Sequence, residues 1–363
     1  MTGALSRNAR PTRASSATLP PAGPAWYGAV MGTGILATLT QTVGPSGVVD
    51  AARALLVIGW LLLIGLTVGF ATRVTRDREV LAASLRPATL PLWGMVAMGV
   101  LSIGSATAAV LPAWWPALNT AAVVTDGALW VLGSVIGLAT TVRFAALLRR
   151  TDLGAPTTVW GLAVVPPMVS ATVGAGLAPH LPTALRAAML LVTGLCFLLS
   201  LTLGAIIFTV AYHHHWRVAG LPVPASTTAW IPLGVVGQST AAAQLLAGEM
   251  GQLLPGLAGP AHELAVGYGV GMLGLGVPLA GWAVAMTVRG FRRRMPFAPG
   301  WWSLTFPIGT LALGAHLLGV DGGLSLFVAA GVACWVTLCG TWMLCAVASV
   351  RAVLAGRRQP AST

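Results

Sequence analysis

The sequence contains no lysine, and charged residues of any kind are scarce. All 20 basic residues among the 363 are Arg, and charged residues make up 8% of the chain against 56% for apolar residues. A soluble domain carries roughly a quarter charged residues, so this chain has too little charge to cover a water-facing surface of its size. The composition therefore indicates that lipid is the solvent for much of the protein.

Patterns typical of reactive, metal-binding and nucleic-acid-binding proteins are also missing. All four cysteines lie inside apolar segments, which excludes a disulfide framework and metal-ligand spacing. The net charge of +12 comes from arginines in short loops without interleaved aromatic residues, which argues against a nucleic-acid partner. The sequence has no Ser/His/Asp arrangement, no paired carboxylates and no phosphate-binding loop. We therefore expect no enzymatic activity, no cofactor and no bound metal.

Long apolar blocks follow one another along the chain. A helix of roughly 20 residues crosses the hydrocarbon core of a bilayer, so these blocks predict an all-α membrane protein with ten transmembrane helices. The predicted spans are 24–41, 52–71, 89–111, 118–142, 158–177, 184–211, 227–247, 263–288, 301–318 and 324–350. Segments 1–22 and 352–363 are predicted to be cytosolic tails, the first of them disordered, on either side of a transmembrane domain over 23–351.

The arginines alternate with the predicted spans. Connections from an odd-numbered to an even-numbered span contain only Arg53 and Arg186, and the other 18 arginines lie in the remaining connections and the termini. Cytoplasmic loops of membrane proteins carry the excess of Arg and Lys. We therefore predict a multi-pass protein of the inner (plasma) membrane with both termini in the cytoplasm. Missing or adding one span would scramble this asymmetry.

The odd-numbered spans begin roughly every 65–75 residues, which predicts five repeated helical hairpins. Odd spans carry Gly and Pro near mid-membrane, whereas most even spans are rich in Leu, Val and Ala. Backbone carbonyls freed by Pro must be satisfied by neighbouring protein or by a water-filled cavity. We therefore predict that the five odd spans form an inner ring around a pore and that the even spans face lipid. Close helix packing through small residues is the alternative.

Several motifs in the odd spans suit an anion pathway. The adjacent Pro166 and Pro167 interrupt their helix, so the amides that begin its second half would point into the membrane core and attract anions. The polar group from Gln238 to Thr240 could replace part of an anion's hydration shell, or could serve hydrogen bonding between helices. The predicted pore-lining residues are Gly32, Thr33, Gly34, Gly99, Pro166, Pro167, Ser170, Gly237, Gln238, Ser239, Thr305 and Pro307.

Three further side chains suit gating or coupling. Phe306 precedes Pro307, so the helix should kink beside a large ring that could close a narrow pore; an ordinary core Phe is the alternative. Asp126 lies inside the fourth span, where a carboxylate is costly. It could couple proton and substrate movement, or could be structural and hydrogen-bonded. His316, in the ninth span, could titrate near neutral pH or could be a hydrogen-bonded helix-end residue.

Four motifs, in order, resemble those of the tellurite-resistance/dicarboxylate transporter family: PAWYGAVMGTGILA, VVPPMVSA, WIPLGVVGQST and FAPGWWSLTFPIGT. That family includes TehA-like bacterial anion channels, the slow-type anion channels of plant guard cells, and fungal malate and sulfite transporters. The resemblance covers about residues 24–350. It implies five hairpins with quasi-fivefold symmetry, homotrimers with one pore per subunit, and occlusion of the pore by Phe306, which matches the family's position in WWSLTFP.

The resemblance and the residues together predict a transporter of small anions with Phe306 as its gate. The substrates implied are C4-dicarboxylates such as malate, sulfite or inorganic anions. No Arg lies deep in a span, so anion binding should be weak and exchange fast. The alternatives are proton-coupled dicarboxylate uptake and efflux of sulfite or tellurite-related anions. A membrane-embedded enzyme or assembly factor is a further class, for which the sequence offers no reactive cluster.

Overall fold

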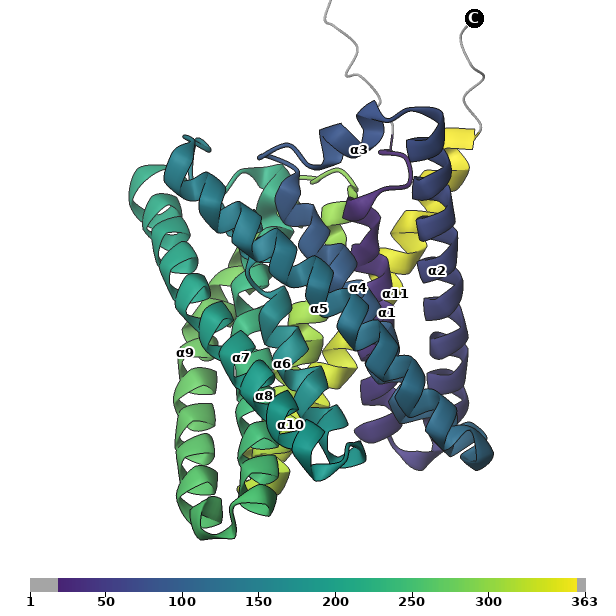
Figure 1. The fold of residues 1–363 in the computed structure, drawn as a ribbon. Helices are drawn as coiled ribbons and strands as arrows, with labels where there is room; N and C mark the ends of the chain where they lie inside the picture. Colours follow the sequence, from purple (N-terminus) through teal and green to yellow (C-terminus); the bar gives the residue numbers. More distant parts are fainter. Residues whose placement is uncertain (1–18, 358–363) are drawn as a thin grey trace, which may run out of the picture.

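The structure, a computed structural model, describes residues 19–357, and every regular element in that range is a helix. Ten main helices run between two faces of the molecule, and the short helix α3 (Glu79–Ser84) lies on one of these faces (Figure 1). The main helices are α1 (Tyr27–Thr42), α2 (Val49–Arg76), α4 (Trp93–Trp114), α5 (Asn119–Arg150), α6 (Pro166–Leu177), α7 (Thr183–His213), α8 (Ile231–Leu253), α9 (Ala258–Arg292), α10 (Phe306–Asp321) and α11 (Ser325–Arg357).

Eight helical segments in the described range are long and apolar enough to cross a bilayer, which confirms the prediction of an all-α membrane protein. The segments that contain α1 and α8 do not meet this criterion, although the sequence predicts spans there. In α8 the polar residues Gln238, Gln244 and Glu249 are all buried. Because protein rather than lipid surrounds these groups, α8 can lie at membrane depth with a lower hydropathy.

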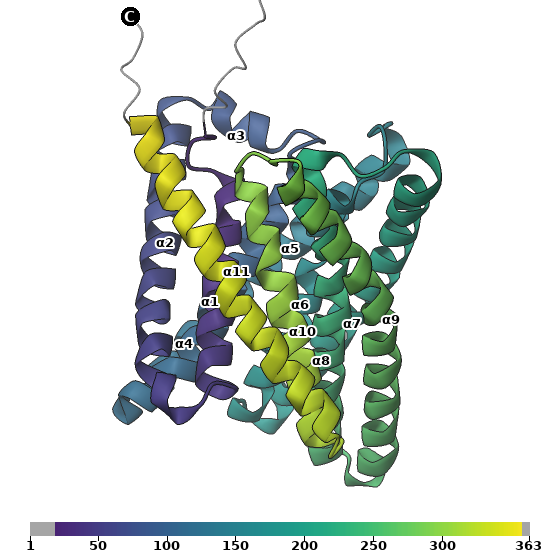
Figure 2. The same ribbon diagram turned by 180° about the vertical axis from the view of Figure 1, so that it is seen from behind.

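The helices form two layers. Consecutive helices pack in pairs, α1 on α2, α4 on α5, α6 on α7, α8 on α9 and α10 on α11. The first members of the pairs also contact one another in the order α1, α4, α6, α8 and α10, and α10 contacts α1, so these five helices close a ring. Figures 1 and 2 show the longer second members, such as α5 and α11, lying obliquely across the outside.

Burial separates the two layers. In the apolar spans of the ring helices α4, α6 and α10, 72–94% of the residues are buried, against 11–33% in the spans of α2, α5, α7, α9 and α11. In α1, 13 of the 16 residues are buried. The outer helices expose large apolar side chains such as Leu61, Val124 and Leu191. Such a surface is stable only against hydrocarbon.

Each ring helix begins with a 3₁₀ segment. These segments are Pro24–Trp26, Leu90–Leu92, Thr158–Ala163, Val223–Trp230 and Pro299–Leu304. In three ring helices the α-helical part begins late, beside a proline: at Pro166 in α6, at Ile231, next to Pro232, in α8, and at Phe306, next to Pro307, in α10. Proline has no N–H to donate, so it is tolerated in the first turn of a helix but not in its interior. The helix breaks predicted at Pro166 and Pro307 are present in the structure.

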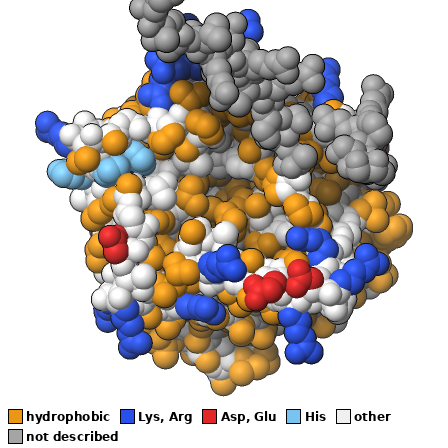
Figure 3. Space-filling model, turned by 90° about the horizontal axis from the view of Figure 1, so that it is seen from above, with side chains coloured by type: hydrophobic (Ala, Val, Ile, Leu, Met, Phe, Trp, Pro, Cys, Tyr) orange, Lys and Arg blue, Asp and Glu red, His pale blue; other side chains and the backbone are white. Residues whose placement is uncertain are grey.

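Most of the arginines lie on the face that carries α3, which we call the arginine-rich face. Both ends of the described chain lie on this face (Figures 1 and 2), and Arg side chains stand around its hollowed centre (Figure 3). Arg73, Arg143 and Arg289, in α2, α5 and α9, each donate to a backbone carbonyl just before the first helix of their own pair. These arginines therefore tie the two helices of a hairpin together.

The predicted tails fall mostly outside the described part of the chain. Of the predicted N-terminal tail, residues 1–18 lie outside the described residues, as do residues 358–363 of the predicted C-terminal tail. The last helix, α11, continues to Arg357, beyond the domain end that we predicted at residue 351.

Candidate functional site

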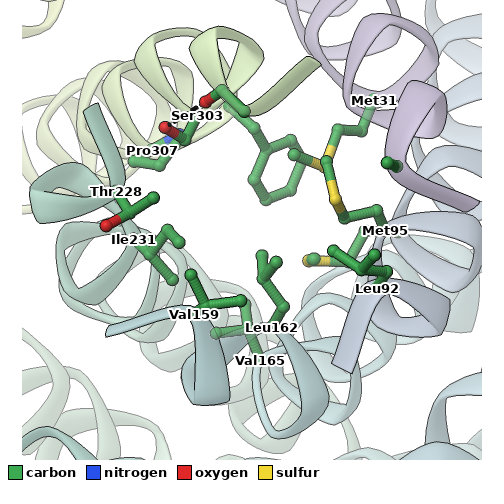
Figure 4. Close-up of a pocket in the computed structure, with 15 residues that line it drawn as sticks. Met31, Leu92, Met95, Val159, Leu162, Val165, Thr228, Ile231, Ser303 and Pro307 are labelled. Atoms are coloured by element: carbon green, nitrogen blue, oxygen red, sulfur yellow. Dashed lines mark hydrogen bonds between the residues drawn. The ribbon is translucent and has the colours of Figure 1, made fainter. Parts of the chain in front are cut away.

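Two cavities follow one another inside the ring of helices. The inner cavity, nearer the arginine-rich face, has a volume of about 80 Å³. Its walls are mostly apolar, and Figure 4 shows Met31, Met95, Val159, Leu162 and Ile231 arranged around its opening. The outer cavity has a volume of about 310 Å³ and is lined by residues nearer the C-terminal ends of the same ring helices. Its polar lining residues are Thr38, Ser102, Ser105, Asp126, Thr172 and Gln238.

Phe306 lies between the two cavities. Among the described residues, it alone lines both of them. Its side chain is 3% exposed and stands at the first position of α10, directly after the 3₁₀ segment. The late start of α10, next to Pro307, therefore places a large apolar ring where the inner and outer cavities adjoin. This position suits a barrier between two water-accessible spaces.

The two cavities differ in the hydrogen-bonding groups that they offer. The inner cavity is lined by two hydroxyl groups, and both form hydrogen bonds to backbone carbonyls. Thr228 donates to the carbonyl of Ala225 at 2.7 Å, and Ser303 lies 2.7 Å from the carbonyls of Thr227 and Gly300. Neither cavity is lined by Arg or His. Among the residues that line the two cavities, Asp126 alone is acidic and none is basic, so an anion inside the described ring meets no positive charge. The outer cavity holds most of the polar groups.

Some of the site residues predicted from sequence line the two cavities, and others do not. Phe306 and Pro307 line the inner cavity, and Phe306, Gln238 and Asp126 line the outer one. The other predicted residues line neither cavity: Gly32, Thr33, Gly34, Gly99, Pro166, Pro167, Ser170, Gly237, Ser239, Thr305 and His316. Most of the predicted pore-lining residues thus lie outside these two cavities.

The predicted glycines lie where ring helices touch. A Cβ on Gly237 of α8 would lie 2.3 Å from the carbonyl carbon of Thr310 in α10, and one on Gly34 of α1 would lie 2.8 Å from the Cβ of Ser102 in α4. Gly32 of α1 faces Thr305 in the same way. Atoms cannot approach so closely, so only glycine permits this helix spacing. Close packing, the alternative left open by the sequence, is the role that the structure gives these residues.

Two of the predicted hydroxyls, those of Thr33 and Ser170, are turned toward the outer helices. Thr33 of α1 accepts a hydrogen bond from the indole of Trp342 in α11 at 2.9 Å. Ser170 of α6 accepts one from Ser134 in α5 at 2.9 Å, and its carbonyl accepts one from the indole of Trp130 at 2.8 Å. These bonds fasten the ring to the outer layer. Their direction explains why neither hydroxyl lines a cavity.

The amides after Pro166 and Pro167 are not available to an anion. Both prolines lack an N–H, and the next two amides, of Met168 and Val169, donate to the carbonyl of Val165 at 2.9 and 3.3 Å. The predicted role of this half-helix therefore rests on its dipole alone. The buried Nδ1 of His316 has no hydrogen-bond partner among the described residues, so this atom does not support the hydrogen-bonded alternative.

Sequence reasoning missed several residues that line the cavities. Met31, Met95 and Met98 line the inner cavity beside Phe306, and Ser102 and Ser105 line the outer one. The spacing of Ser102 and Ser105 by three residues places them on one face of α4, which was a usable signal. The methionines gave none, because Met is common in apolar cores. Within residues 19–357, no group of three or more His, Cys, Asp or Glu is placed to hold a metal ion.

Comparisons with known proteins match the chain over most of its length. A family model described as voltage-dependent anion channel matches residues 22–350. The chain is 26% identical to a sulfite efflux pump, SSU1, of Arthroderma otae, and the match covers 88% of both chains. Proteins of the same name from Trichophyton rubrum and Arthroderma benhamiae are 24% and 25% identical over 88% of both chains.

Proposed function

The chain belongs to the voltage-dependent anion channel family, and we propose that it carries small anions across a membrane through the centre of its helix ring. The observation that carries the proposal is the succession of two cavities inside the ring, with Phe306 between them. A lining without positive charge suits rapid passage, because an anion that meets no opposite charge is bound weakly and leaves easily. Selection would then depend on diameter and on the donors of the outer cavity.

The charge distribution supports anions as the cargo. The arginine-rich face carries Arg side chains around a hollow (Figure 3), and the inner cavity is the one nearer this face. Their field raises the local concentration of anions near this face and fades over a Debye length of about 8 Å at physiological salt. Arg73, Arg143 and Arg289 keep their charge while they hold backbone carbonyls, so their structural bonds do not remove this effect.

Phe306 is the gate in this proposal. Its buried ring separates two spaces that are otherwise open to small molecules, and a ring of this size forms an apolar constriction that excludes a hydrated ion. Rotation of the side chain, or movement of the first turn of α10, would join the cavities. The methionines Met31, Met95 and Met98 line the inner side of the barrier, and their flexible side chains can adapt to a moving ring.

Sulfite is the first substrate to test, because the fungal relatives are named for its efflux. Dicarboxylates such as malate, and inorganic anions, are the other candidates. The purified protein should be reconstituted in liposomes and the fluxes of sulfite, malate, nitrate and chloride compared with those of protein-free liposomes. We expect protein-dependent flux of sulfite. An absence of flux for every anion would overturn the proposal and reopen the possibility of an enzyme or assembly factor.

The same liposomes distinguish a passive channel from a proton-coupled carrier. With nitrate or chloride, which do not take up protons near neutral pH, a passive channel moves charge without changing the internal pH. Proton-coupled uptake or efflux instead gives a pH transient that depends on the anion gradient. We also propose, from the family resemblance, that the protein forms homotrimers in the plasma membrane with cytoplasmic termini. Chemical cross-linking of the protein in its membrane should then stop at a species of three chains.

A further inference from the structure

The outer cavity contains a carboxyl group whose charge nothing nearby balances. Asp126 of α5 is 4% exposed, and its Oδ1 has no hydrogen-bond partner among the described residues. The ion pairs within residues 19–357 involve other acids, namely Asp50, Glu79 and Glu249. A buried carboxylate without a counter-charge or a full set of hydrogen bonds is one of the most costly groups in a protein interior.

The surrounding helices direct this carboxyl into the cavity. Trp130 and Ser134, which follow Asp126 at intervals of four residues and so share its helix face, both hydrogen-bond to Ser170 of the ring helix α6. That face of α5 is therefore turned inward. A Cβ on Gly104 of α4 would lie 2.5 Å from the Asp126 Oδ1. Glycine at this position leaves the space through which a side chain from the outer layer reaches the cavity.

No other titratable group shares this space. The remaining described residues that line the outer cavity are apolar or carry neutral hydroxyls or an amide. The ring helices that pack on α5, α4 and α6, contain no titratable side chain. His180, which follows α6, lines a separate groove with Val123 and Gly127 of α5, and neither His180 nor His316 nor Asp321 lines the outer cavity. Glu249 of α8 is paired with Arg186, at 2.7 Å from its Nε. The electrical state of the outer cavity therefore depends on Asp126 alone.

We propose that Asp126 is protonated in the conducting protein and donates its O–H to an oxoanion held in the outer cavity. The proposal rests on the anion transport proposed above and specifies its site and its regulation. An ionised Asp126 would repel the anion, and a carboxylate at membrane depth costs roughly 2.5–3.5 kcal/mol on insertion scales. Protonation removes both the repulsion of the anion and the cost of a buried charge, and it adds an O–H donor to a cavity that the hydroxyls of Ser102 and Ser105 also line. An oxoanion has several acceptor oxygens, so it can bond to all three groups at once.

Proton exchange at Asp126 should follow the pH on the side away from the arginine-rich face, because Phe306 separates the outer cavity from that face. Acid on this outer side keeps the carboxyl neutral and supports anion passage, whereas alkali ionises it and reduces passage. If only the protonated form conducts, flux falls roughly tenfold per pH unit once ionisation prevails. The protein would then conduct anions in response to external acidity.

The test is nitrate flux into liposomes with oriented protein, measured while the outer pH is varied. Nitrate stays a monoanion throughout, so a pH effect belongs to the protein. The flux of the wild-type protein should fall as the pH rises. Asp126→Asn, which keeps a neutral donor, should conduct at every pH without this fall, and Asp126→Leu, which has no donor, should conduct less. The control is Asp50→Asn, since the Asp50 side chain is 92% exposed, and it should follow the wild type.

A flat wild-type profile, or an Asp126→Asn variant that still follows the wild-type profile, would overturn the proposal. Wild-type protein that passes no anion at any pH would instead defeat the transport function. Infrared spectra of the purified wild-type protein test protonation without transport and without a variant that must fold. A carboxylic-acid C=O band that persists at neutral pH and shifts in D₂O is expected. Its absence would overturn the assignment of a protonated Asp126.

Discussion

Replacement of Phe306 by Ala is the sharpest test of the barrier between the two cavities. The ring is 3% exposed in its present position. Full burial of a Phe side chain stabilises it by about 1.5–3 kcal/mol relative to exposure, and this burial is lost when the ring swings out to open the path. At about 1.4 kcal/mol per factor of ten, the open arrangement is then roughly 10- to 100-fold rarer than the closed one. Phe306→Ala removes the free energy that favours the closed arrangement, so anion flux should rise roughly 10- to 100-fold.

The substitution also has a cost in stability that must be separated from its effect on flux. Large-to-small changes of a core Phe cost about 3–5 kcal/mol. Phe306 adjoins a cavity on either side and should fall at the low end of this range. Phe144 is the matched control, since it is fully buried, packs on Trp160 with ring centroids 6.0 Å apart, and lines neither cavity. Phe144→Ala should lower stability at least as much without raising flux.

The assay is efflux of sulfite or chloride from proteoliposomes, normalised to the amount of folded protein. Phe306→Leu provides a graded step and should give flux between wild type and Phe306→Ala. Unchanged flux in well-folded Phe306→Ala protein would remove this residue from the gate. An equal rise in Phe144→Ala would show that the increase reflects a general leak through a loosened bundle, which would refute the reasoning just as directly.

Two further predictions concern packing and topology. Gly237→Ala should markedly lower the melting temperature in detergent, because the added Cβ meets the backbone of Thr310 at 2.3 Å. Gly248→Ala in the same helix is the control and should not lower it, because a Cβ there meets nothing within 4 Å. Equal melting temperatures of the two variants would contradict the close α8–α10 contact. A membrane-impermeant thiol reagent applied to intact cells should label Ser46→Cys, which is exposed between α1 and α2, and should not label Arg78→Cys on the arginine-rich face. The opposite labelling would invert the proposed orientation.

The positions of the helices along the chain were largely predictable, because the bilayer requires a continuous apolar segment at each crossing. Apolar length marks a span wherever a helix faces lipid, and each of the ten predicted spans coincides with a helix of the described chain. Gly and Pro near mid-membrane occur in all five ring helices, including α1 and α8, which length and hydropathy do not identify as spans. They also occur in the outer helix α9, which contains Pro278, so this signal alone does not separate the two layers. The break at Pro166 and the late start of α10 beside Pro307 were also predictable from sequence, because proline interrupts the hydrogen bonds of the helix that contains it.

The residues that face the cavities were much less predictable, because they depend on how far each helix is rotated about its axis. Composition describes a whole helix, whereas rotation is decided by contacts with its neighbours. Gly237 is turned toward Thr310, and Ser170 is turned toward α5. Asp126 was singled out from sequence, yet only the tertiary structure brings it from an outer helix into the outer cavity, through the space that Gly104 leaves on another helix.

By itself, the sequence determined that this chain is a helical membrane protein, because too few charges and long apolar blocks leave lipid as the only suitable solvent. The tertiary structure decided which side chains enclose the central space, because that outcome requires the simultaneous packing of five ring helices and the helices around them. Phe306 belongs to both accounts. The sequence alone shows that Phe306 precedes Pro307, but its position between two cavities depends on the packing of the five ring helices around it.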